Sequence, residues 1–433
     1  MFKLQKNNTS IKTEVTAGFT TFLTMAYIVI VNPMILEAAG VPFAQAFTAT
    51  IIAAIVGCLL MGLWGNFPIA IAPGMGLNAY FAYSVVGANN LDAKVAFAAV
   101  FVAGFLFFLL ALTPIRSLLI KAIPDTLKHS IAAGIGLFIA FIGLRLSGLV
   151  QADQTNFVKL GDLHSPSAIL TIVGIAITLF LLVRNINGAI FIGMLLTAII
   201  AIFTGQLSFD NGFFSMPSLP EGLYITDPIS PFKMIFDYGL YGVVFSFLLV
   251  TLFDTTGTFI GVATQAKMQK EDGTIPRAER SMISDSVATL VGSIFGTSPT
   301  TSFIESTSGV AVGGRTGLTA VVVAMLFALT AFFGPFVSAI GGVSAITAPT
   351  LIIVGGMMMA NVRHINWNDF EEIFPAFLVM LSMPLTSSIS TGIACGFIFY
   401  PFIKVLLGKG KEIHPLLYIF GILFFIQLAF FPH

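Results

Sequence analysis

Charged side chains are scarce in this sequence. Only 9% of its 433 residues are Asp, Glu, Lys or Arg, whereas soluble domains carry about 25%. So few charges cannot cover a water-facing surface, which excludes an ordinary soluble protein. Acidic and basic residues balance at 20 each, so net charge gives no reason to expect a nucleic-acid partner.

Motifs for catalysis and metal binding are also missing. Cys58 and Cys395 lie in apolar runs without CxxC or metal-ligand spacing, so we interpret both as small hydrophobic residues. No HExxH, GxSxG or GxxxxGK[ST] motif occurs, and Gly313–Gly317 lacks the lysine and the spacing of a phosphate loop. We therefore expect no enzyme, no metal and no cofactor. The polar residues 1–12 also predict that there is no cleavable signal peptide.

Long apolar runs dominate instead. Hydrophobic residues make up 57% of the chain and the mean hydropathy is +0.97. A bilayer core needs roughly 20 apolar residues per helix, so we predict an all-α polytopic membrane protein with about 14 transmembrane segments. The predicted spans are 15–36, 44–64, 67–87, 94–113, 126–149, 167–183, 187–205, 238–265, 281–296, 298–314, 316–340, 343–362, 370–386 and 388–407. A further apolar stretch, 415–431, either crosses the membrane again or lies along it.

Basic residues predict the orientation. With a cytoplasmic N-terminus, most of the 20 Lys and Arg residues fall on the inner side, as the positive-inside rule requires. Only Lys94, Arg145, Lys159 and Lys233 fall outside. We therefore expect a multi-pass protein of the cell membrane with its N-terminus in the cytoplasm.

The span pattern divides into two halves. Residues 1–205 hold seven spans, residues 206–235 form a long external loop, and residues 236–407 hold seven more. Because seven is odd, a duplicated second half would insert upside down, which is the inverted-repeat plan of many secondary transporters. Residues 408–433 form a C-terminal apolar segment outside this plan.

Two spans in corresponding positions contain helix-breaking residues. Span three includes Ala72–Asn78 (APGMGLN) and span ten includes Gly296–Ser302 (GTSPTTS). Each places a proline and small residues near the middle of the span, where a continuous helix is disfavoured. Paired breaks of this kind point to a transporter's binding site, although two ordinary proline kinks would give the same pattern.

Three acidic residues lie inside apolar spans: Asp254, Asp285 and Glu305. A carboxylate at mid-bilayer costs about 2.5–3.5 kcal/mol on insertion scales, so it normally faces a partner or a cavity. No Lys or Arg lies deep in a predicted span to neutralise them. These acids mark the protein as a transporter, because a receptor or scaffold would not need them.

The neighbours of these acids indicate a polar, uncharged ligand. Asp254 lies in FDTTGT and Glu305 in TTSFIESTSG, both rich in hydroxyl groups. Asn78 follows the break in span three and offers both donors and an acceptor. Asp285 is open to two interpretations, a proton carrier or a structural acid that binds the broken segments.

Two other classes of function compete with this interpretation. An anion exchanger or channel could use the N-termini of the half-helices, although the flanking carboxylates argue against an anion. A membrane enzyme such as an intramembrane aspartyl protease is disfavoured, because Asp254 and Glu305 are an unlike pair in differing contexts.

Four strings in the sequence are distinctive: TFLTMAYIVIVNP (21–33), APGMGLNAYFAY (72–83), FDTTGTFIGVATQA (253–266) and GTSPTTSFIESTSGVAVGGRTGLTA (296–320). Together they resemble one known family, the azaguanine-type purine permeases of the nucleobase–cation symporters. The likeness extends over nearly the whole chain.

The resemblance implies fourteen segments in two inverted seven-helix repeats, with short strands breaking segments 3 and 10. A core domain of spans 1–4 and 8–11 would move against a gate domain of the other six. The protein would import hypoxanthine, guanine or adenine by proton symport, with hypoxanthine and guanine favoured, and related permeases suggest a homodimer. The implied substrate-binding residues are Asn78, Asp254, Thr258, Thr300, Thr301, Ser302 and Glu305. The implied proton-coupling residues are Asp254 and Glu305, with Asp285 in a supporting role.

Overall fold

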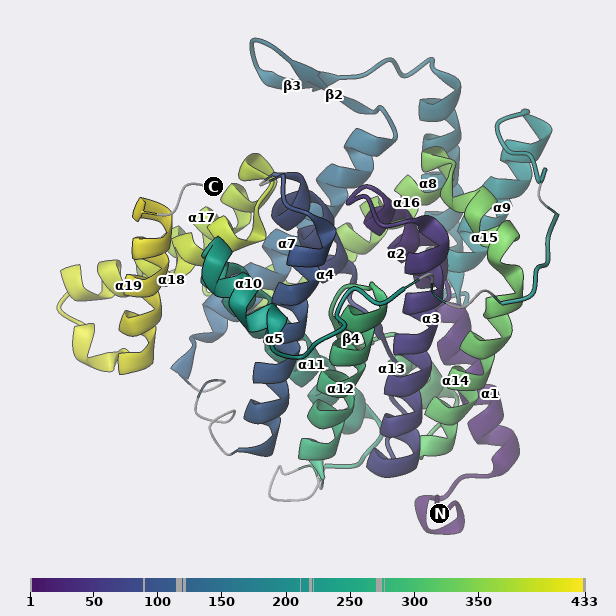
Figure 1. Ribbon diagram of the computed structural model, residues 1–433, viewed down its shortest axis with the longest axis horizontal. Coiled ribbons are helices and arrows are strands. Elements are labelled where there is room, and N and C mark those ends of the chain that lie inside the picture. The colour runs from purple at the N-terminus through teal and green to yellow at the C-terminus, as the bar shows by residue number, and fades with distance from the viewer. Residues whose placement is uncertain are drawn as a thin grey trace.

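Helices make up nearly all of the regular structure (Figure 1). The computed structural model describes residues 2–88, 90–113, 119, 122–210, 212–217, 220, 222–269, 275 and 277–430. Within them, nine helices are long and apolar enough to cross a membrane. The other predicted segments are shorter, broken by a strand or, in α12 (Ala278–Phe295), too polar for that criterion.

The first half of the chain contains seven membrane segments, of which the third is broken. Its elements are η1 (Gln5–Asn7), α1 (Ile11–Met25), α2 (Ile28–Glu37), α3 (Phe43–Leu59), η2 (Leu60–Gly65), β1 (Ile71–Pro73), α4 (Met75–Ala79), η3 (Tyr80–Gly87), α5 (Ala93–Leu112), α7 (Asp125–Leu146), β2 (Val150–Asp153), β3 (Phe157–Leu160), α8 (Pro166–Val183) and α9 (Ala189–Phe203).

The second half repeats the plan, with the break in the tenth segment. Its elements are α10 (Ser230–Tyr238), α11 (Tyr241–Gln265), α12, β4 (Thr300–Ser302), α13 (Ser306–Val312), α14 (Gly317–Thr330), η4 (Ala331–Phe333), α15 (Gly334–Gly341), α16 (Ser344–Met358), η5 (Met359–His364), α17 (Phe370–Thr386), α18 (Ile389–Leu406), η6 (Gly410–Glu412) and α19 (Pro415–Phe430).

The two breaks meet. Strand β1 pairs with β4 in antiparallel register, with Ala72 opposite Thr301. This pairing confirms the predicted strands in segments 3 and 10. The prolines in both sequences explain why the chain is not helical here, and the ladder satisfies backbone groups that lipid could not.

The helices pack in two groups. In the core group, α12 packs on α3 and α5, and α14 packs on α1 and α3. In the gate group, α7 packs on α16 and α17, while α8 packs on α9 and α16. Fewer contacts join the groups, chiefly through α11 and α4. This grouping is the core and gate division that the resemblance implied.

A buried acid joins two helices of the core group, α1 and α14. Glu14, on the first turn of α1, is fully buried. Its carboxylate accepts hydrogen bonds from the backbone N–H groups of Arg315, Thr316 and Thr319 and from the Thr319 hydroxyl at 2.6 Å. Glu14 therefore caps α14, where a negative charge favours the helix dipole. Glu14 precedes the first predicted span in the sequence, and that position gave no sign of its burial.

Two connections contain regular structure that was not predicted. The segment predicted as a loop at 206–235 includes the start of α10, which continues to Tyr238. The connection between the fifth and sixth segments contains the β2–β3 hairpin, which projects from the side of the molecule opposite the N-terminus (Figure 1). The domain boundaries at residues 205, 235 and 407 remain predictions.

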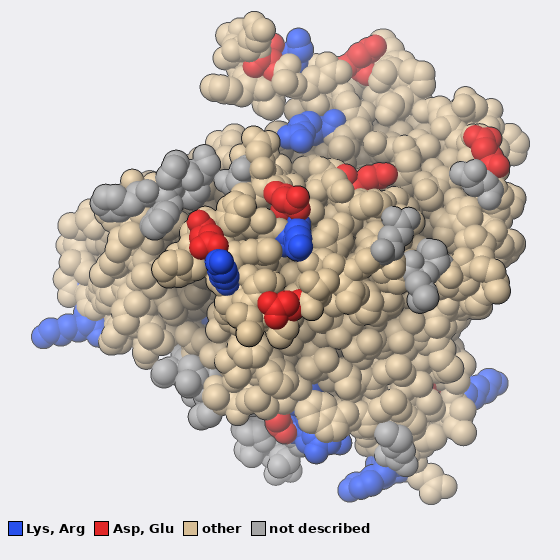
Figure 2. Space-filling view, in the orientation of Figure 1, with Lys and Arg blue, Asp and Glu red and all other residues tan. Residues whose placement is uncertain are grey.

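Charged side chains are sparse on the surface of the molecule. On the face shown in Figure 2, uncharged residues cover most of the surface, and the charged ones lie toward its edges and in a small group near the centre of the view. The lower edge, where the N-terminus lies, carries mainly Lys and Arg. A multi-pass protein held in a bilayer would show this distribution.

Candidate functional site

The candidate site lies where β1 and β4 cross. Gly74 donates its backbone N–H to Pro299 at 3.0 Å, and Phe303 donates to Ala70 at 2.9 Å, so the pairing extends beyond both strands. Each strand leads into a short helix, β1 into α4 and β4 into α13. The two half-helices therefore start close together, and their positive ends favour electron-rich ligand groups.

Asp285 lies on the side of this crossing where α12 packs. It is fully buried on α12 and accepts a hydrogen bond from the Thr255 hydroxyl of α11. The Thr300 hydroxyl donates to Asp285 Oδ1 at 2.7 Å, and Thr289 lies 2.9 Å from the same hydroxyl. Thr300 therefore points toward α12, and Asp285 joins α11, α12 and β4.

Asp254 and Glu305 lie on the other side. The Thr301 side chain hydrogen-bonds to Asp254, and the Tyr27 hydroxyl donates to Glu305 Oε1 at 2.8 Å. The two carboxylates are close enough for their charges to act on each other. In the part of the chain that the structure describes, no ion pair involves either acid.

An exposed stripe leads to Asp254 along α11. Asp254, Gly257, Ile260, Gly261 and Thr264 are all exposed, at the spacing of one helix face. A Cβ atom added to Gly257 would meet nothing within 4 Å. A carboxylate facing lipid would be costly, so an exposed stripe of this kind is expected to face water. The stripe runs from Asp254 toward the C-terminal end of α11.

The other predicted residues are buried around the crossing. Thr258 is 7% exposed on α11, and Ser302 is 2% exposed, with a hydroxyl oxygen that has no partner. Asn78 is fully buried on α4 and donates to Asn32 at 3.0 Å. The structure thus groups Asp254, Thr301 and Glu305 beside the exposed stripe and buries the remaining residues around the crossing.

Sequence reasoning missed Tyr27 and Asn32. Both lie in TFLTMAYIVIVNP, the string in segment 1 that resembles the permeases. Their polar groups within an apolar span were the available signal, because such groups need partners in a membrane. Only the fold shows that these partners are Glu305 and Asn78.

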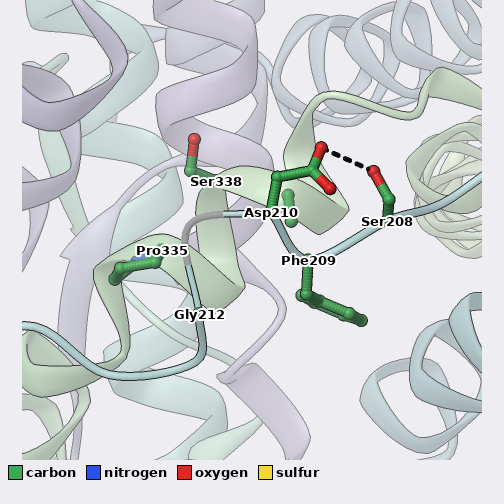
Figure 3. Close-up of a pocket in the computed structure, with 7 residues that line it drawn as sticks. Ser208, Phe209, Asp210, Gly212, Pro335 and Ser338 are labelled. Atoms are coloured by element: carbon green, nitrogen blue, oxygen red, sulfur yellow. Dashed lines mark hydrogen bonds between the residues drawn. The ribbon is translucent and has the colours of Figure 1, made fainter.

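A separate cavity lies away from these acids. It has a volume of about 200 Å³ and is lined by Ser208, Phe209, Asp210, Gly212, Pro335, Ser338 and Ala339 (Figure 3). Asp210 is held by Ser208 at 2.9 Å within the segment that follows α9. None of the predicted site residues lines this cavity. Within the described ranges, no group of three or more His, Cys, Asp or Glu residues could hold a metal ion.

Comparison with solved structures identifies the fold. The transmembrane domain of the cyanobacterial bicarbonate transporter BicA superimposes with a TM-score of 0.64 at 15% identity, covering 89% of this chain and 97% of that one. SLC26A9 gives a TM-score of 0.67 at 12% identity, covering 92% of this chain and 66% of that one. These transporters share the architecture described above.

Comparison of sequences identifies the family. Residues 12–395 match the model of a permease family. The guanine/hypoxanthine permease PbuO of Bacillus subtilis (strain 168) is 61% identical over 430 residues, which cover 99% of both chains. The adenine permease AdeP of Escherichia coli (strain K12) is 41% identical over 430 residues, which cover 99% of this chain and 95% of that one. The chain is therefore a transporter rather than an enzyme, and it belongs to the permease family in its branch of purine nucleobase permeases, as the azaguanine-type resemblance implied.

Proposed function

We propose that this protein imports purine bases by proton symport and favours hypoxanthine and guanine over adenine. One observation carries the proposal. Asp254 and Glu305 lie together beside the exposed stripe of α11, among hydroxyl groups and without an ion pair in the described structure. Unpaired carboxylates inside a membrane mark ion and substrate pathways.

The proposed binding step uses both acids. Glu305 accepts N–H groups of the purine, while Asp254 contacts the opposite edge or carries the proton. Thr301 and Tyr27 hold the two carboxylates in place through their hydrogen bonds. A proton taken up by either acid removes a negative charge, which lowers the cost of moving that acid past apolar surfaces.

The proposed transport step moves the core group against the gate group. The exposed stripe on α11 runs toward the C-terminal end of that helix, which the positive-inside rule predicts to be cytoplasmic. In the proposed cycle this arrangement is the inward-open state of a protein in the cell membrane with a cytoplasmic N-terminus. A homodimer remains a prediction.

The relatives support the preference for oxo-purines. PbuO, at 61% identity, and PbuG of Bacillus subtilis (strain 168), at 44%, are both guanine/hypoxanthine permeases. The adenine permeases AdeP and AdeQ of Escherichia coli (strain K12) are 41% and 40% identical. A third guanine/hypoxanthine permease, GhxP of Escherichia coli O157:H7, is 34% identical, so the support for this preference comes from PbuO.

Uptake of labelled hypoxanthine into cells that lack their own purine permeases tests the proposal. We expect uptake that unlabelled guanine competes for strongly and adenine competes for weakly. A protonophore should abolish accumulation at constant sodium, because the proton gradient supplies the driving force. Accumulation that follows sodium instead, or adenine as the strongest competitor, would contradict the corresponding part of the proposal.

An anion exchanger is the second candidate, because BicA and SLC26A9 share the fold. In reconstituted vesicles, an anion flux that does not depend on purine would favour this alternative. We expect none, because the two carboxylates beside the exposed stripe would repel an anion.

A further inference from the structure

A chain of buried hydrogen bonds leads from α3 to Asn78. The Thr50 hydroxyl donates to the backbone oxygen of Ala46 at 2.6 Å. Asn32 Nδ2 donates to Thr50 Oγ1 at 2.7 Å and to Thr297 Oγ1 at 2.8 Å. Asn78 Nδ2 then donates to Asn32 Oδ1 at 3.0 Å. The side chains of this chain are all 0% exposed.

The hydrogen bonds in this chain can point in only one direction. A threonine hydroxyl has one hydrogen, and that of Thr50 is used on Ala46. Thr50 can therefore only accept from Asn32, so the Asn32 nitrogen must face Thr50 and its oxygen must face Asn78. The Ser298 hydroxyl, which donates to the same oxygen at 3.3 Å, reinforces this orientation.

The orientation of Asn78 follows from that of Asn32. If the Asn78 amide flipped, its oxygen would lie against the Asn32 oxygen, two acceptors without a hydrogen between them. Asn78 Oδ1 therefore points away from Asn32, and it is a buried oxygen without a partner in the structure. Such a group costs roughly 1–3 kcal/mol when it is left unpaired. A ligand N–H group would satisfy it.

Asn78 belongs to the same crossing as the two acids. It lies on α4, directly after β1, and β1 pairs with the strand that carries Thr301, the partner of Asp254. Asp254, Glu305 and the oxygen of Asn78 are all acceptors when the acids are ionised. A ligand with N–H groups on several edges matches this set.

We propose that Asn32 is a positioning residue that fixes Asn78 as an acceptor and so sets the preference among purines. The inference rests on the proposed function. A 6-oxopurine carries a hydrogen on N1, whereas adenine has a lone pair there. At N1, adenine would therefore place an acceptor against the Asn78 oxygen, where a 6-oxopurine places a donor. If Asn32 no longer fixes the amide, Asn78 can rotate and donate its N–H to adenine.

Two isosteric substitutions separate this role from a general structural one. In Thr50→Val, Asn32 can turn over, because the Thr297 hydroxyl is able to donate as well as accept. In Thr297→Val, Thr50 still fixes the direction of Asn32. Both variants remove one buried hydroxyl from the same asparagine, so Thr297→Val is the matched control. Asn32→Ala removes the link to Asn78 altogether.

The measurement is the ratio of hypoxanthine to adenine affinity. It is read from competition of labelled uptake and from ligand-induced shifts in the melting temperature of the purified protein. We expect Asn32→Ala and Thr50→Val to lower the ratio about tenfold, the effect of one hydrogen bond, and Thr297→Val to leave it within about twofold of wild type. If Asn32→Ala does not fold, Thr50→Val with its control decides the question.

An unchanged ratio in Thr50→Val, or an equal fall in Thr297→Val, would overturn the role of Asn32. A loss of affinity for all bases in the same proportion would also overturn it. Failure of the proposed function looks different, because the wild-type protein would then take up and bind no purine at all.

Discussion

Asp285 and Glu305 lie on opposite sides of strand β4, and their surroundings differ sharply. Asp285 is 0% exposed and accepts from two threonine hydroxyls, Thr255 and Thr300. Glu305 is partly exposed, and the Tyr27 hydroxyl is the partner of its carboxylate at 2.8 Å. A carboxylate whose oxygens are already bound suits a structural role, whereas one with free acceptor sites suits a ligand or a proton.

The largest expected effect is that of Glu305→Gln. Glutamine keeps the size of the side chain but replaces one oxygen with an N–H donor, so we expect hypoxanthine uptake to fall at least about a hundredfold. Uptake should be compared at equal amounts of protein in the membrane. Thermal unfolding in detergent should stay within a few degrees of wild type, because Glu305 binds few protein groups.

Asp254→Asn tests the second acid beside the exposed stripe. We expect a similar loss of purine accumulation. Asp254 has two proposed roles, and they are separated by measuring purine exchange across the membrane without a proton gradient. Exchange that survives would show that Asp254 carries the proton. Loss of exchange together with accumulation would show that it contacts the base. Normal uptake by Asp254→Asn would remove this acid from the mechanism.

Asp285→Asn should affect stability more than ligand recognition. An amide at this position places an N–H group against one of two hydroxyl donors, which costs about 1–3 kcal/mol. We expect a lower melting temperature of the purified protein, while the competition pattern among purines stays the same. A stable Asp285→Asn variant that exchanges purines but no longer responds to the proton gradient would instead make Asp285 the proton carrier.

The sequence predicted the membrane segments, their breaks and the three acids, but not which side of strand β4 each acid lies on. The apolar runs predicted the segments, and the prolines near residues 73 and 299 predicted the breaks. The three acids were also identified by their place in apolar spans. The sequence set Asp285 apart from the other two acids, but it left open whether Asp285 carries a proton or binds the broken segments. Only the pairing of β1 with β4 shows which hydroxyl groups point toward which acid.

Burial at span edges was harder to predict. Lys404 is 8% exposed near the end of α18 and lies 2.7 Å from Glu371, which is 7% exposed. Lys409 also binds Glu371, at 2.9 Å. These residues are distant in sequence and lie near the ends of their spans, so periodicity and composition gave no sign that they form one buried ion-pair cluster.

Tyr27→Phe is a milder way to test the side of β4 on which Glu305 lies. It removes the hydroxyl that donates to Glu305 and leaves the ring in place. Loss of this bond frees the carboxylate to move, so we expect uptake efficiency to fall about tenfold. The fall should come mainly from weaker binding of the base. Val29→Ala in the next helix, α2, is a control because Val29 is also buried but has no polar group that could bind an acid. A wild-type binding constant in Tyr27→Phe would show that Glu305 needs no such support.

The smallest expected effect concerns the contact between η3 of the core group and the turn between α17 and α18 of the gate group. Ser84 donates to the backbone oxygen of Ser387 at 2.5 Å, and Arg145 lies over the Tyr83 ring at 5.9 Å. Because the exposed stripe runs toward the C-terminal end of α11, we expect these contacts to favour the inward-open state. Ser84→Ala removes one hydrogen bond, so the equilibrium between the inward-open and outward-open states should shift about fivefold toward the outward-open state. The measurement uses Gly257→Cys in a background with Cys58→Ala and Cys395→Ala, and a thiol reagent added from the inside. Adding Ser84→Ala should lower the rate of labelling by about the same factor. Faster labelling in Ser84→Ala would show that the contact stabilises the outward-open state instead.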